Sequence, residues 1–399
     1  MTRPESALLS ALRCACRGEK LSDLELTAEE WETTLRLAAE QETLPLVFDA
    51  VCACPSLRRL GAERRRTIQK KALELATRQV VQTNEFLTLI LAAQARGLDP
   101  VVLKGVTLRS LYPQPMLRPS VDEDLLVRPK EAEKYRRFFL ERGLTEDDQE
   151  AGELSFHKPD SPTYIELHTE LFPGDSRAYG DCGALFAGAP DRTVVQRVED
   201  VELRTLSPTD HMLYLICHAY KHFLHGGAGL RHVCDMGMLS ARFGPEIDWP
   251  DILRRCESIR IHIFAAALLS LGERYLGFPA PAVFATLAAD PDDMLADMLS
   301  GGMYGNSDED RVHSSAVTLE AVAARKEGRG ARGLLAAAFP EARSLEGRYT
   351  FLPSRPWLLP AAWAMRLWDY TRGGRAHPGA SLHIAEARLR LLREYGIID

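Results

Sequence analysis

The sequence predicts an α+β protein in which a small mixed sheet is flanked by N-terminal and C-terminal helical domains. Residues 1–96 and 206–399 show the apolar periodicity of helices, and only residues 97–205 contain short apolar runs of the strand type. With 399 residues, of which 46% are hydrophobic, the chain is long enough for two or three domains with cores. We therefore predict a helical region at 1–96, an α/β core at 97–205 and a helical domain at 206–399.

Start and stop signals mark the helices of the two flanking regions. Thr27 is followed three residues later by a glutamate, which predicts a helix that begins with a capping box. A periodic stretch at residues 63–95 predicts one long helix, and Gly97 ends it. Ser207 followed by Pro208 predicts that a new helix begins where the α/β core ends.

The α/β core is predicted from apolar runs separated by turn residues. Five strands are expected at residues 100–103, 124–127, 154–157, 164–168 and 194–203. After the second strand, Pro129 begins a predicted helix with its apolar residues on one face, and Gly143 ends that helix. Turn residues at 158–162 join the third and fourth strands as a hairpin.

Charge and hydropathy narrow the classes of partner. The formal net charge is -7 and the pI is about 5.9, which disfavours long nucleic acid, because proteins that grip phosphate backbones carry a basic surplus. A small molecule, a nucleotide or a protein is favoured as substrate. The first 20 residues lack an apolar core of the signal-peptide type, and the most apolar windows, at 259–271 and 357–368, are too short to cross a bilayer. We expect a cytoplasmic protein without a membrane partner.

Eight cysteines in a chain of this length are expected to be free thiols. Cys14 and Cys16 form one C-x-C pair, and Cys52 and Cys54 form another, so a four-thiolate zinc site is an alternative. Zinc sites use C-x2-C spacing more commonly, and both pairs lie in or beside predicted helices. Buried thiols are therefore the favoured interpretation.

Acidic residues gather around the second predicted strand. Alternate side chains of a strand share a face, so Asp122 and Asp124 point the same way and Glu123 points the other way. Two such carboxylates repel each other unless a cation lies between them, and Mg²⁺ prefers hard oxygen ligands. Glu166, on a later strand, is the expected third carboxylate. Replacing Asp124 by Asn should then relieve repulsion and leave the metal-free protein folded or more stable.

The order of these motifs resembles the polymerase-β-like nucleotidyltransferase superfamily, and within it an uncharacterised bacterial nucleotidyltransferase family. The resemblance covers about residues 98–170 and rests on Leu103-Lys104-Gly105, Leu111-Tyr112-Pro113, Arg118, Asp122-Glu123-Asp124-Leu125-Leu126-Val127 and Ile165-Glu166-Leu167-His168. Two features depart from the superfamily pattern. Its Gly-Gly/Ser turn after the first strand is replaced by Lys104-Gly105-Val106-Thr107, and its third acid, commonly Asp, is Glu.

This resemblance implies an enzyme that moves NMP from an NTP, with ATP expected, onto a small-molecule or protein acceptor. Asp122, Asp124 and Glu166 would be its catalytic residues and its Mg²⁺ ligands. Residues implied to contact the nucleotide are Lys104, Gly105, Thr107, Arg118, His168, His218 and His222. Simpler roles stay open for three of them: Lys104 as a solvated strand end, Thr107 as a helix cap and Arg118 as a structural salt bridge.

Histidines crowd the helical segment that follows the predicted sheet. His218, His222 and His225 fall on one helical face and Asp235 follows, so a His/Asp metal hydrolase is a rival hypothesis. The segment lacks an H-E-x-x-H base, and we favour a role for these residues as the wall of a cleft facing the carboxylates. The other alternative is a catalytically silent nucleotide-binding or interaction protein of the same fold.

Overall fold

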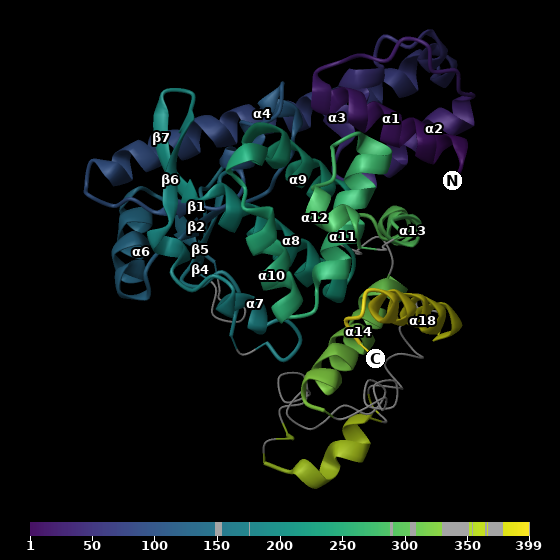
Figure 1. The fold of residues 1–399 in the computed structure, drawn as a ribbon. Coiled ribbons are helices and arrows are strands. Elements are labelled where there is room, and N and C mark those ends of the chain that lie inside the picture. Colours follow the sequence, from purple (N-terminus) through teal and green to yellow (C-terminus); the bar gives the residue numbers. More distant parts are fainter. Residues whose placement is uncertain are drawn as a thin grey trace.

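The computed structural model describes residues 1–147, 154–174, 176–287, 290–303, 309–328, 351–352, 354–363, 365 and 378–398. These residues form a seven-stranded mixed sheet with helices on its faces and further helices before and after it in the chain (Figure 1). The predicted α+β class is confirmed.

The sheet has the strand order β3-β4-β5-β2-β1-β7-β6. Its strands are β1 (Val101–Val102), β2 (Glu123–Leu126), β3 (Thr145–Glu146), β4 (Leu154–His157), β5 (Tyr164–His168), β6 (Thr193–Val198) and β7 (Val201–Leu206). β2 runs antiparallel to β1 and parallel to β5, while β1 runs parallel to β7. β4 and β5 form the predicted hairpin, and the stretch predicted at 194–203 forms the antiparallel pair β6 and β7.

Side-chain alternation divides the sheet into two different faces. On one face, Leu125 of β2 and Ile165 and Leu167 of β5 join a core with α6 (Ala132–Glu141). Leu126 points to the opposite face, where it joins the larger core that includes α8 (Pro208–His225). Because Asp124 and Leu126 have the same parity, the acid lies on the α8 side of the sheet.

The long helix α4 (Ala62–Gln94) connects the two cores. It has 33 residues and is therefore about 50 Å long. Ile68 and Ala72 in its first half pack into the core of the N-terminal helices, whereas Phe86 and Ile90 in its second half pack under the sheet. The prediction of one long helix that stops before Gly97 is confirmed, and Gly97 has the positive φ of 74° that favours glycine after a helix end.

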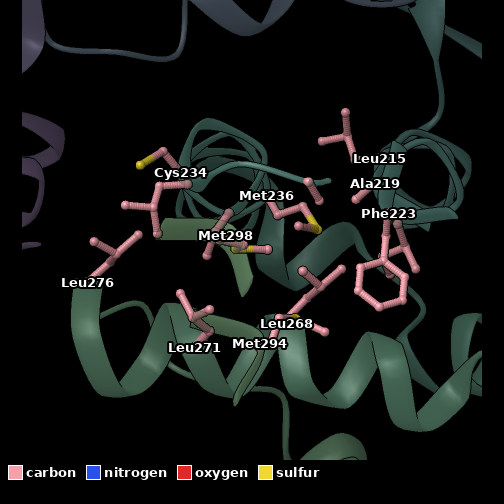
Figure 2. Packing of buried hydrophobic residues seen from close by; sticks show 14 of the residues in the cluster. Leu215, Ala219, Phe223, Cys234, Met236, Leu268, Leu271, Leu276, Met294 and Met298 are labelled. Atoms are coloured by element: carbon pink, nitrogen blue, oxygen red, sulfur yellow. The ribbon is translucent and has the colours of Figure 1, made fainter. Parts of the chain in front are cut away.

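N-terminal and C-terminal helices share one hydrophobic core. It contains apolar residues of α1 (Arg3–Arg17), α2 (Ala28–Glu40) and α3 (Leu44–Val51), together with those of α8, α9 (Leu230–Phe243), α10 (Trp249–Ser258) and α11 (His262–Leu271). Figure 2 shows its centre, where Phe223 of α8, Met236 of α9 and Leu268 of α11 come together. The regions predicted before and after the sheet therefore pack on each other as well as on the sheet.

Helix starts follow the sequence signals. Thr27 accepts a hydrogen bond from the Glu30 N–H at 3.2 Å, and the Glu30 carboxylate accepts one from the Thr27 N–H at 2.8 Å. The Ser207 hydroxyl accepts from the Asp210 N–H at 3.2 Å, so α8 begins directly after β7. This short connection fixes α8 against the sheet face that carries Asp124.

Further helices complete the C-terminal region. They are α12 (Ala282–Ala285), α13 (Asp292–Gly301), α14 (Glu309–Lys326) and α18 (Pro378–Glu394). α14 packs on α8, where the Thr318 hydroxyl donates to the Leu224 carbonyl at 2.6 Å, and on α18. The short α5 (Val106–Arg109) and α7 (Asp181–Ala184) lie in connections of the sheet region. Part of the domain predicted at 206–399, including residues 329–350, lies outside the described residues.

Two predictions from composition meet structural observations. All eight cysteines are free, and among the described residues the clusters with three candidate metal ligands contain no cysteine, which supports thiols over a zinc site. Within the same described part of the chain, no helix combines the length and the apolar character needed to cross a membrane.

Candidate active site

Asp124 and Glu166 lie opposite each other on neighbouring strands. They are Cα partners in the parallel pair of β2 and β5, and His168 follows Glu166 on the same face of β5. Asp122 lies just before β2, which begins at Glu123, and its side chain is half-buried. The shared parity expected from the sequence therefore places Asp124, Glu166 and His168 at one point on the α8 side of the sheet.

Asp124 is the buried centre of this point. Its side chain is 1% exposed, and its Oδ1 atom lies 3.1 Å from Lys104 Nζ and 3.1 Å from His168 Nε2. His168 Nε2 also lies 3.4 Å from Glu166 Oε2, so the imidazole bridges the two acids. Asp124 Oδ2 is buried and has no hydrogen-bond partner among the described residues. One oxygen of the central carboxylate is thus open to a ligand.

The charges of these groups stabilise one another. Burial alone would raise the pKa of Asp124, but Lys104 and His168 outweigh burial and hold that pKa well below its usual range. Burial likewise opposes the charge of His168, yet hydrogen bonds to Asp124 and Glu166 raise its pKa to about 9. Asp124 keeps the pKa of Lys104 well above its usual value despite burial. At neutral pH the site therefore holds an ionised Asp124 between two cationic groups.

The two carboxylates of this cluster suit a metal ion, whereas protonated His168 has no lone pair to offer one. One ligand atom from each of Asp124, Glu166 and His168 falls within 4.8 Å of the others. Asp122 does not belong to this set, but its charge acts on Lys104. Its half-buried carboxylate, at the outer edge of the site, would be a further ligand. Carboxylate oxygens are the ligands that Mg²⁺ prefers, and the unpartnered Asp124 Oδ2 is the atom that the structure leaves for one. Asp124 and Glu166, with Asp122 at the rim, are thus the residues that would hold the ion.

The turn after β1 supplies Lys104, and the structure of this turn itself explains why Gly105 follows. Gly105 has a positive φ of 63°, and a Cβ built on it would overlap the Glu123 carboxylate. That carboxylate accepts a hydrogen bond from the Val106 N–H at 2.8 Å. The Thr107 hydroxyl is buried and donates to the Lys104 carbonyl at 3.2 Å, which shapes the turn. Contacts of Gly105 and Thr107 with a nucleotide stay predictions.

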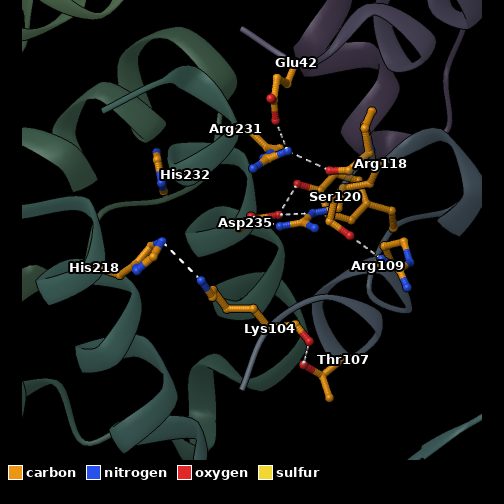
Figure 3. Close-up of polar contacts among 12 residues, drawn as sticks. Glu42, Lys104, Thr107, Arg109, Arg118, Ser120, His218, Arg231, His232 and Asp235 are labelled. Carbon is orange, nitrogen blue, oxygen red and sulfur yellow. Dashed lines mark hydrogen bonds and ion pairs between the residues drawn. The ribbon is translucent and has the colours of Figure 1, made fainter. Parts of the chain in front are cut away.

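Arg118 is held by Asp235. Its Nε atom donates to Asp235 Oδ1 at 3.0 Å and one terminal nitrogen donates to Oδ2 at 2.5 Å, with both side chains buried (Figure 3). The Tyr112 hydroxyl donates to Asp235 Oδ1 at 2.7 Å. Of the two roles expected for Arg118, the structural salt bridge is the one that the contacts describe. Both oxygens of Asp235 are engaged in this way, which leaves the metal-hydrolase hypothesis without the carboxylate it invoked.

Three histidines form a second cluster beside the carboxylates. Ring nitrogens of His218 and His222 on α8 and of His232 on α9 lie within 4.8 Å of one another. Lys104 joins the two clusters, because its Nζ lies 3.4 Å from His218 Nε2 (Figure 3) and also 3.1 Å from Asp124 Oδ1. The expected cleft wall of His218 and His222 thus reaches the carboxylates through Lys104.

The histidine cluster is uncharged at neutral pH. Burial, reinforced by Lys104 and the neighbouring rings, holds the pKa of His218 well below its ordinary value, and His222 is affected in the same direction. Burial and the charges of Arg231 and Lys104 lower the pKa of His232 to about 3. His225, which the sequence places on the same helical face, lies outside the cluster and contacts the Tyr179 hydroxyl at 3.2 Å.

Sequence reasoning missed two parts of this region. Glu123 was expected only to point away from the site; it is fully buried and pairs with Arg109, which also hydrogen-bonds Ser120. Gln82 of α4 donates to the same carboxylate at 3.2 Å. His232 belongs to the same histidine-rich segment as His218, but it was not among the predicted nucleotide contacts, because it lies on a different helix and no periodicity relates the two. The available signal was the crowding of five histidines within residues 211–232.

Comparisons with known proteins agree with the motif-based resemblance. A model of the uncharacterised nucleotidyltransferase family matches residues 27–277, which is more than half of the chain and includes the whole sheet, α8 and α9. Neither a curated protein nor a solved structure matches the chain.

Proposed function

The chain belongs to the uncharacterised nucleotidyltransferase family, and from this premise we propose that it transfers NMP from an NTP to a small-molecule or protein acceptor. In that reaction an acceptor oxygen forms a bond to the α-phosphorus, the bond to the bridging oxygen breaks, pyrophosphate leaves and the acceptor loses its proton. The observation that carries the proposal is the pairing of Asp124 with Glu166 across parallel strands, with Asp124 Oδ2 buried and unpartnered.

Mg²⁺ is the cofactor that fits these donors. Held by Asp124 and Glu166, with Asp122 at the rim, it would offset phosphate charge and lower the pKa of an attacking hydroxyl. The chain's own groups have complementary tasks. The Lys104 ammonium lies beside Asp124 and can neutralise a phosphate oxygen, and protonated His168 can donate to one. ATP is the expected nucleotide.

A label-transfer assay tests the proposal. The full chain is incubated with each α-labelled NTP, Mg²⁺ and a cell lysate, and label on any acceptor is measured together with released pyrophosphate. Asp124→Asn should reduce transfer by at least a thousandfold, because an amide cannot balance the charge of a divalent ion. Asp160→Asn is the matched control, since Asp160 is exposed in the β4–β5 turn with a φ of 55° that Asn tolerates. Equal transfer by both variants would refute the proposal.

One observation favours a second candidate. Lys104 and His168 already neutralise Asp124 Oδ1 without any metal, which would suit a catalytically silent protein that binds nucleotide. Pyrophosphate release separates the two candidates. NTP binding that is independent of Mg²⁺, with no pyrophosphate release from any NTP, would select the silent alternative.

A further inference from the structure

Tyr214 of α8 is a buried tyrosine whose hydroxyl makes no hydrogen bond to a described residue. The residue is 3% exposed, and buried tyrosine hydroxyls usually have a partner, because an unpaired phenol loses the hydrogen bonds it made to water. The ring is held by aromatic neighbours, with ring centres 5.8 Å from Phe172 and 6.4 Å from Phe186. Packing therefore accounts for the ring of Tyr214 but not for its hydroxyl.

The position of Tyr214 on α8 brings it to the carboxylates. It lies one helical turn before His218, and the two rings are 5.8 Å apart. His218 Nε2 lies 3.4 Å from Lys104 Nζ, which lies 3.1 Å from Asp124 Oδ1. Asp124 is the strongest of the neighbours that raise the pKa of Lys104, and Tyr214 is the next strongest. The hydroxyl that has no partner thus belongs to the candidate active site.

The Tyr214 hydroxyl and Asp124 Oδ2 are a donor and an acceptor that do not bond to each other. Burial, reinforced by Asp124, raises the pKa of Tyr214 well above its usual value, so the phenol keeps its hydrogen at neutral pH and can donate. Asp124 Oδ2 is buried and accepts from no described residue. A ligand that serves both atoms must bring a cation to the carboxylate and an acceptor oxygen to the phenol. A phosphate group bound together with Mg²⁺ has both properties.

We propose that the Tyr214 hydroxyl donates a hydrogen bond to a non-bridging oxygen of the α-phosphate of the NTP. The inference rests on the proposed function, because it names a further residue that contacts the reacting phosphate of the same substrate. If Asp124 and Glu166 hold the metal, that phosphate lies beside them, on the sheet face that α8 covers. Tyr214 keeps its proton while the acceptor oxygen bonds to the phosphorus and pyrophosphate leaves. Its task is to stabilise charge on the α-phosphate.

Binding of ATP and of ATPαS tests this contact on the full chain, by calorimetry with Mg²⁺ and without an acceptor. In ATPαS a sulfur replaces one of the two non-bridging α-phosphate oxygens, which gives two diastereomers. Tyr214→Phe keeps the ring and removes only the hydroxyl, and it should weaken ATP binding by about 10- to 100-fold. Sulfur accepts hydrogen bonds poorly, so the diastereomer with sulfur at the contacted position should lose at most about threefold. The ratio of the two diastereomer affinities should therefore differ between variant and wild type.

Tyr395→Phe is the matched control. The Tyr395 hydroxyl also lacks a partner, but it is enclosed in the core where its ring packs against Phe223 and Phe264. Tyr395→Phe should bind ATP and both diastereomers like the wild type. In the transfer assay, Tyr214→Phe should reduce NMP transfer by about a hundredfold, whereas Tyr395→Phe should not change it. Tyr214→Phe should melt no lower than the wild type, because the free protein loses no hydrogen bond.

Three results would overturn the inference. They are an ATP affinity of Tyr214→Phe within about twofold of wild type, a loss of affinity that is equal for ATP and both diastereomers, and unfolding of Tyr214→Phe, which would show that the hydroxyl serves the structure. The outcome is separable from that of the transfer assay. Transfer that depends on Asp124 but not on Tyr214 refutes only this inference. A diastereomer ratio that depends on Tyr214, without transfer to any acceptor, refutes only the transferase.

Discussion

Histidines occur in two neighbouring clusters of this protein and have opposite charge states in them. His168 lies between Asp124 and Glu166, and its pKa is about 9, whereas His232 lies among cations and other imidazoles, and its pKa is about 3. Both side chains are largely buried, so burial does not account for the difference. The difference between the two pKa values follows from the sign of the nearest charges, which are negative at His168 and positive at His232. Lys104 contacts both clusters and so lies between the carboxylates and the three histidines.

The largest expected effect comes from removing the charge at the centre of the carboxylate cluster. Asp124→Asn should lower the free energy of unfolding of the metal-free protein by about 3–5 kcal/mol, because it leaves two buried cationic groups without their partner. This reverses the expectation drawn from repulsion between Asp122 and Asp124, since Lys104 and His168 already neutralise Asp124. Urea denaturation of wild type and variant with EDTA measures the difference. A more stable variant would restore the repulsion argument.

The next largest effect concerns the pH dependence that His168 imparts. Its pKa is raised from 6.5 to about 9 in the folded protein, so its stabilisation is complete below pH 6.5 and is lost as pH rises through 9. The shift corresponds to about 3 kcal/mol. His168→Gln should therefore be less stable than wild type at pH 6 and close to it at pH 10. Thermal melts of both proteins from pH 6 to pH 10 measure this difference in stability. A difference that stays constant with pH would contradict the positive charge assigned to His168.

A smaller effect of opposite direction is expected at the histidine cluster. The pKa of His232 falls from 6.5 to about 3 on folding, so its contribution is favourable above pH 6.5 and is lost as pH falls toward 3. At pH 5 this costs the folded state about 2 kcal/mol, which His232→Gln should avoid. The measurement is the change in unfolding free energy between pH 7 and pH 5 in both proteins. Identical changes would mean that His232 is not kept neutral by its surroundings.

The smallest stability effect is expected at Glu166, and it sharpens the distinction between folding and chemistry. The Glu166 side chain is 29% exposed and lies 3.4 Å from His168, so Glu166→Gln should cost less than about 1 kcal/mol. If Glu166 holds the metal, NMP transfer should nevertheless fall by at least about a hundredfold. Parallel melts and transfer assays give the two values. Transfer within twofold of wild type would remove Glu166 from the catalytic set.

Local sequence patterns predicted which face of the sheet carries the site. They did not predict contacts between residues that are far apart in the sequence. Strand parity placed Asp124 and Glu166 on one face because alternation along a strand is a local property. The partner of Arg118 could not be predicted in this way, since Asp235 lies on a helix 117 residues later. For the same reason, the position of Lys104 between Asp124 and His218 could not be predicted. The sign of the change in unfolding free energy caused by Asp124→Asn depends on that position. Patterns showed which residues bear charge, whereas the protonation states depended on tertiary neighbours.

The buried Glu123 has a consequence for strand pairing. Asp122, Glu123 and Asp124 are three consecutive acids. If the pairing of β2 shifted by one residue, an acid would still face the site, but all side chains of the strand would move to the opposite face of the sheet. Arg109 and the Val106 N–H donate to the Glu123 carboxylate, which they can reach only when Glu123 lies on the sheet face opposite Asp124. Burial of Glu123 beside Arg109 therefore fixes the alignment of β2 in which Asp124, and not Glu123, faces Lys104 and His168.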